Sequence, residues 1–172
     1  MVRLIRNLTL FVLALLVVSL PSFVVAAPKT AQQDPELLVR KIMGLAYESN
    51  QSVNSVPFAV GNSLKKVKKA WGPADDLSTA TANYYSHNVR FLYDNSTKRK
   101  KITGIDDFDP QVQTIHLADV TGLLGQPTKA VEQEGSYYVT YSYNKKHEVV
   151  FIFESITSSS NPTLFMYMVH LK

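Results

Sequence analysis

The residues with the most obvious chemical potential in this 172-residue chain are three closely spaced carboxylates, Asp106, Asp107 and Asp109, which precede Pro110. Clustered carboxylate oxygens suit Ca²⁺, but the usual calcium loop spaces its ligands by two and adds a glycine and a distal glutamate. Those additions are missing, so we interpret the segment as a turn and a cap before Pro110. A hydrolase that uses these carboxylates is the last of three functions that we considered.

Other nucleophiles and metal ligands lack the patterns that mark sites. No two of His87, His116, His147 and His170 have the spacing of a helical metal pair, and each is expected at the surface or the core edge. The serines 158–160 lack a Gly-x-Ser-x-Gly frame. Cysteine is absent, which excludes thiol nucleophiles, disulfides and zinc-thiolate sites. We therefore expect no catalytic residue, no metal and no cofactor, and hence no enzyme.

Basic residues form two clusters: Lys65, Lys66, Lys68 and Lys69, and Lys98, Arg99, Lys100 and Lys101. The first lies on the polar side of a predicted helix and the second in a predicted turn between strands. Lysines in such places keep a surface soluble and sheet edges unpaired. The functional alternative is contact with a polyanion, such as a cell-wall polymer or anionic lipid.

The first 26 residues have the pattern of a secretory signal peptide. Arg3 and Arg6 precede an almost wholly apolar run, Leu8–Leu20, and small residues lead to a predicted cleavage after Ala26. The run is shorter than the ~20 residues of a membrane-spanning helix, so an uncleaved anchor is the lesser alternative. Loss of both arginines lowers the net charge from +4 to +2, which gives no reason to expect nucleic-acid binding. The protein is predicted to be secreted.

A polar, flexible leader, residues 27–34, is expected to precede a single globular domain over 35–172. Asp34 and Pro35 are typical of a helix start, and the apolar stripe of this helix ends near Ser49. A loop covers 50–57. A short amphipathic helix over 64–71 ends at Gly72-Pro73, and a second one starts at 115 and ends at Gly125.

The two short helices indicate an internal repeat, with units of about 58–109 and 110–172. At a shift of 53, Leu64 matches Leu117, Val67 matches Val120, Gly72 matches Gly125, and Tyr84-Tyr85 matches Tyr137-Tyr138. Strand patterns follow each helix, at 82–86, 89–93 and 101–108, and at 137–143, 149–154 and 164–171. The predicted fold class is α+β: two tandem helix-plus-antiparallel-meander units form one continuous sheet with helices on one face, after an extra N-terminal helix.

The final strands are apolar on both sides, which raises the question of what covers the second side. If Phe151, Phe153, Phe165, Tyr167 and Val169 pack under the helices, the opposite face carries Tyr138, Val150, Ile152, Met166, Met168 and His170. A solvated antiparallel face should be polar, and an aromatic and methionine patch suits partner recognition. Two alternatives remain. Other parts of the chain bury this face, or the two alternating sets of side chains have the reverse assignment to the two faces.

The helix ending in Trp71-Gly72-Pro73 and its following strands resemble the β-lactamase-inhibitor-protein-like fold. From the Leu37-Leu38 helix through 58–61 to 151–154, the chain resembles more specifically the YjgB-like family of secreted proteins of unknown function. That resemblance implies no catalytic residues. It implies, by analogy of fold alone, an inhibitor-like module whose sheet face grips a partner. The partner would be an extracellular protein or a cell-wall component.

Overall fold

The computed structural model describes residues 34–172, so the predicted signal peptide and all of the leader except Asp34 lie outside the described residues. The first helix, α1 (Pro35–Ser49), begins where the Asp34 carboxylate accepts a hydrogen bond from the Glu36 N–H at 3.0 Å. It ends at Asn50, which adopts the left-handed conformation that asparagine tolerates. Within 34–172, no helix has the length and the hydropathy needed to span a bilayer.

Two shorter helices follow, α2 (Leu64–Trp71) and α3 (Leu117–Leu124), and each stops at a glycine with positive φ, Gly72 or Gly125. Ser63 caps α2 through a hydrogen bond from the Lys65 N–H. We expected His116 to lie inside the short helix that was predicted to start at residue 115, but it is the residue that precedes α3. Its N–H donates to the Asp119 carboxylate at 2.7 Å.

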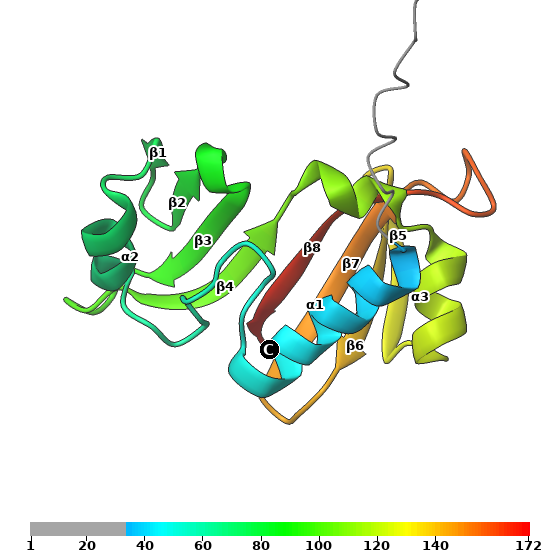
Figure 1. Ribbon diagram of the computed structural model, residues 1–172, viewed down its shortest axis with the longest axis horizontal. Coiled ribbons are helices and arrows are strands. Elements are labelled where there is room, and N and C mark those ends of the chain that lie inside the picture. Colours follow the sequence, from blue (N-terminus) through cyan, green and yellow to red (C-terminus); the bar gives the residue numbers. More distant parts are fainter. Residues whose placement is uncertain (1–33) are drawn as a thin grey trace, which may run out of the picture. The chain divides into compact units, whose positions relative to one another are not determined.

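The eight strands found within residues 34–172 form one antiparallel sheet with the order β1-β2-β3-β4-β8-β7-β6-β5 (Figure 1). The strands are β1 (Asp76–Leu77), β2 (Thr81–Tyr84), β3 (Val89–Asp94), β4 (Lys101–Asp107), β5 (Lys129–Gln133), β6 (Ser136–Ser142), β7 (His147–Glu154) and β8 (Leu164–Leu171). Short 3₁₀ turns occur at Tyr85–His87 and Pro110–Thr114. The α+β class and the continuous antiparallel sheet agree with the prediction.

The main core lies between the three helices and one face of the sheet. It joins Val39 and Ile42 of α1, Val67 of α2 and Val120 of α3 to alternate strand residues such as Phe91. Successive residues of a strand point to opposite faces, and the strand residues in this cluster face one another across the registers of β2 to β8. The helices therefore cover one face of the sheet, which we call the helix face.

The tandem repeat stays a prediction, although both short helices are followed by four strands. One of the sequence matches does not hold at the level of contacts. The Tyr84 hydroxyl donates to the Gly72 carbonyl at 3.2 Å, and the equivalent bond to Gly125 comes from Tyr141, at 2.9 Å, rather than from Tyr137. The second unit thus has additional residues before this contact, in agreement with its longer strands.

Candidate binding surfaces

The sheet face opposite the helices, which we call the open face, has a continuous row of residues across all eight strands. The registers align Asp76, Asn83, Arg90, Asp106, Met168, Val150, Thr140 and Lys129. This row is polar over β1–β4 and apolar over β8 and β7. Polar side chains at both ends therefore flank an apolar centre.

That centre is a second apolar cluster, separate from the core. Val150, Ile152 and Met166 are only 7–8 % exposed, and Phe108, Tyr138 and Met168 are partly buried against them. All members come from β6, β7 and β8 except Phe108, which follows β4. The residues that we singled out for partner binding therefore do lie together on one face, and they shield one another across strands.

Phe165 is an exception to the predicted alternation, because its side chain is 58 % exposed instead of packed under the helices. The register shifts between Ile152 and Phe153, so that Ile152 faces Met166 while Phe153 faces Leu164. Such an irregularity adds a residue to one strand and re-aims the side chains around it. Leu164, fully buried, takes the core position instead.

Charged residues border the apolar cluster, on β3 and β4 and near the ends of β7 and β8. The Asp106 carboxylate is buried and accepts a hydrogen bond from Arg90 Nε at 2.6 Å, with Arg90 Nη2 at 2.5 Å. Burial raises the pKa of Asp106, and the charges of Arg90 and His170 oppose that rise. His170 Nε2 lies 3.3 Å from a Glu148 carboxylate oxygen. Charges of both signs therefore border the cluster.

The three carboxylates before Pro110 do not converge on one site. Asp106 and Asp107 are consecutive strand residues and point to opposite faces. Asp107 accepts hydrogen bonds from the Tyr167 hydroxyl at 3.0 Å and the Asn54 N–H at 2.9 Å, on the helix face. Asp109 caps the following 3₁₀ turn by accepting from the Gln111 N–H, as the turn interpretation expected.

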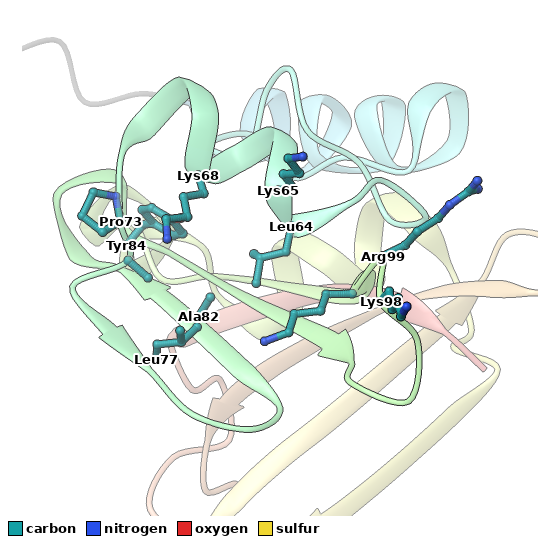
Figure 2. A pocket seen from close by; sticks show the side chains of 11 residues that line it. Leu64, Lys65, Lys68, Pro73, Leu77, Ala82, Tyr84, Lys98 and Arg99 are labelled. Carbon is teal, nitrogen blue, oxygen red and sulfur yellow. The ribbon is translucent and has the colours of Figure 1, made fainter.

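Two hydrogen bonds to backbone carbonyls bring the two basic clusters together. The Leu64 N–H at the start of α2 donates to the Lys100 carbonyl at 3.0 Å, and the Ser63 hydroxyl donates to the Arg99 carbonyl at 2.8 Å. A cavity of about 290 Å³ opens there. Its cationic lining residues are Lys65, Lys68, Lys98, Arg99 and Lys100, and its other lining residues are Leu64, Pro73, Ala74, Leu77, Ala82 and Tyr84 (Figure 2). Lys66, Lys69 and Lys101 do not line it.

The other histidines have separate structural surroundings. The His87 ring stacks on Trp71 with ring centroids 3.8 Å apart, and His147 Nδ1 lies 3.2 Å from the Asn144 amide oxygen. Burial, with help from Lys146, lowers the pKa of His147. Over residues 34–172, no group of three histidine or carboxylate side chains is placed to hold a metal ion.

Sequence reasoning missed two features of these surfaces. It did not bring the turn at 98–101 beside α2, because the turn takes part in that contact only through its backbone carbonyls, which carry no side-chain pattern. It also missed the hydrogen bonds of Asp107 with Tyr167 and Asn54. The predicted strand over 101–108 contained the necessary signal, because strand alternation separates Asp106 from Asp107.

Comparison with known proteins gives a family without an assigned activity. No curated protein and no solved structure matches the chain significantly. The family profile described as "Domain of unknown function (DUF4309)" matches residues 39–170. This range covers nearly all of the described structure, from within α1 to His170, the penultimate residue of β8. The chain therefore belongs to the DUF4309 family of domains of unknown function.

Proposed function

We propose that this protein is a secreted binding module, not an enzyme, and that its open face holds a partner protein outside the cytoplasm. The observation that carries the proposal is the cluster of Val150, Ile152 and Met166 on the face away from the helices. In the described part of the chain, its apolar neighbours are strand side chains and Phe108 alone. Val150, Ile152 and Met166 are only 7–8 % exposed, so Phe108, Tyr138 and Met168 supply the accessible apolar surface. An accessible apolar surface with a polar surround is characteristic of protein interfaces.

The border of the patch supports a protein partner over a polymer of one charge. Arg90 and Asp106 bring both signs to its β4 side, and Glu148 and His170 add charged groups on β7 and β8 themselves. Protein surfaces also carry both signs. Such an arrangement steers and orients a partner with the complementary pattern. The expected partner therefore has an apolar protrusion that contacts Tyr138 and Met168, with mixed charges beside it.

A photo-crosslinking experiment tests this surface by position. Benzoylphenylalanine replaces Tyr138 on the open face, or Tyr47, which is 69 % exposed on α1, and the protein is irradiated with cell-envelope extract of its source. We expect one discrete protein adduct from position 138 and none from 47. Excess unlabelled protein should suppress the adduct, whereas an excess of the folded Tyr138→Ala/Met168→Ala variant should not. The same adduct from both positions, effective competition by the variant, or no adduct at 138 would contradict the proposal.

A second candidate function is binding to an extracellular polyanion, and the meeting of the two basic clusters favours it. Over residues 34–172, no carboxylate lies within 4.0 Å of these eight cations. Polyanion binding depends on summed charge, so it should weaken steeply between low and high salt. We expect Lys66→Glu/Lys69→Glu to reduce retention on isolated cell walls as much as Lys65→Glu/Lys68→Glu does. Retention that is independent of salt would exclude this function.

A further inference from the structure

The cavity between α2, the β1–β2 edge and the turn at 98–100 combines an apolar floor with a cationic rim. Leu64, Ala82 and Tyr84 are at most 7 % exposed, while Leu77, on the two-residue strand β1, is 58 % exposed. Figure 2 shows Leu64 and Lys68 extending from α2 toward the strands, and the Arg99 guanidinium pointing away. Leu77 and Ala82 are cross-strand partners, so both side chains lie on the same face of the sheet.

The rim cations are available to an anion. No described carboxylate lies within 4.0 Å of Lys65, Lys68 or Lys98. Lys100 Nζ lies 5.2 Å from the centroid of the Tyr93 ring, so it already has a favourable neighbour. On the adjoining segment, Asp75 accepts a hydrogen bond from the Tyr85 N–H and Asp76 accepts one from the Asn83 amide. These two carboxylates therefore have partners of their own.

The size and lining of the cavity restrict its occupant. A volume of about 290 Å³ lies at the lower end of the range for small-molecule sites, so it has room for one short hydrocarbon or aromatic group. The only lining side chain with a polar group besides the cations is Tyr84, whose hydroxyl donates to the Gly72 carbonyl. A peptide backbone would find few side-chain hydrogen-bond partners there, whereas a hydrocarbon needs none.

We propose that this cavity binds a single-chain anionic amphiphile. Its hydrocarbon end lies against Leu77 and the accessible edge of Leu64, and its phosphate or carboxylate head lies among Lys65, Lys68 and Lys98. The site is independent of the open face. It shares cations with the polyanion candidate but also requires the apolar floor, and that requirement separates the two experimentally.

Calorimetric titration of the purified protein with octyl phosphate, below its micelle concentration, tests the site. Inorganic phosphate supplies the head without the chain, and octyl glucoside supplies the chain without the charge. We expect octyl phosphate to bind with a dissociation constant at least about tenfold lower than either, a difference of about 1.4 kcal/mol. Equal affinity for octyl phosphate and inorganic phosphate would overturn the proposal and leave charge alone. Equal affinity for octyl glucoside would overturn it in favour of an uncharged ligand.

Matched variants locate the binding. Leu77→Glu should raise the dissociation constant by about tenfold or more, because it places a carboxylate at the apolar floor. Leu37→Glu changes a leucine with the same 58 % exposure on α1 and should have no effect. Lys65→Glu/Lys68→Glu should weaken binding, whereas Lys66→Glu/Lys69→Glu, on the same helix but outside the cavity, should change it by no more than about twofold.

The same variants distinguish a free amphiphile from a membrane surface. Equal effects of both lysine pairs, with no effect of Leu77→Glu, would indicate general charge attraction and overturn the cavity site. Adsorption to phosphatidylglycerol vesicles without any binding of octyl phosphate would likewise overturn it, in favour of a lipid surface. A negative photo-crosslinking result on the open face does not change the octyl phosphate results expected for the cavity, because the open-face cluster and the cavity lie on different parts of the sheet.

Discussion

Replacing Phe151 with alanine is expected to lower the free energy of unfolding by about 3–5 kcal/mol, the usual cost of deleting a buried phenylalanine side chain. Phe151 is fully buried on β7, with its ring 6.0 Å from Tyr141 and 6.3 Å from Tyr167 between centroids. Alanine would leave a cavity between these two aromatic rings and the helices. Equilibrium unfolding in urea, at one pH and temperature, measures the change.

Phe165 provides the matched control, because it lies on the neighbouring strand β8 and is 58 % exposed. Phe165→Ala should change the free energy of unfolding by no more than about 0.5 kcal/mol. The comparison tests the register shift between Ile152 and Phe153 as well as the core. A loss for Phe165→Ala as large as that for Phe151→Ala would show that the sheet has the simple alternation that the sequence suggested.

For β8, the sequence pattern predicts the ends of the strand but not which side chains face the core. Its ends, Leu164 and Leu171, follow directly from the apolar run and its flanking turn residues. Its faces do not, because both alternating sets are apolar and period-two reasoning needs a polar side. One irregularity in the pairing with β7 then moves Phe165 out of the core, and no residue in the run marks that position.

The two edge strands, β1 and β5, were not predicted from the sequence, because they have no buried apolar side at all. Every residue of β1 and β5 is exposed, so neither strand has a buried set of side chains that could alternate with a polar set. Their existence depends on backbone pairing with β2 and β6. The candidate cavity depends on one of these strands, since Leu77 lies in β1. The two lysine clusters could be read from composition, but the apolar floor between them could not.

The second large effect is expected at Asp107, which joins β4 and β8 to the loop after α1. Its carboxylate accepts hydrogen bonds from the Tyr167 hydroxyl and the Asn54 N–H, and the same hydroxyl accepts one from the Val53 N–H at 2.8 Å. Asp107→Ala removes the acceptor of four hydrogen bonds, which come from the Tyr167 hydroxyl, the Asn54 N–H and side-chain amide, and the Asp109 N–H. Each buried donor left without a partner costs about 1–3 kcal/mol. We expect a loss of about 2–4 kcal/mol in the free energy of unfolding, measured in urea near pH 5.

The pH dependence of this loss has a definite sign. Burial raises the pKa of Asp107 above its ordinary value of 3.8, while hydrogen bonds from Asn54 and Tyr167 oppose the rise. As the pH increases above that value, the unfolded chain releases the Asp107 proton first, so the wild-type protein loses stability relative to Asp107→Ala. The cost of the substitution should therefore be largest at acid pH and shrink toward neutrality. A cost that grows with pH would mean that the folded protein favours the ionised carboxylate.

Two further variants assign the effect to this hydrogen-bond network. Asp76→Ala removes an exposed carboxylate on β1 and should change the free energy of unfolding by no more than about 0.5 kcal/mol. Tyr167→Phe removes the hydroxyl while it keeps the buried ring. In the double variant with Asp107→Ala, the two losses should be less than additive, because each variant deletes the same hydrogen bond. Strict additivity would show that Asp107 stabilises the loop through Asn54 alone, and that the Tyr167 hydroxyl matters only to Val53.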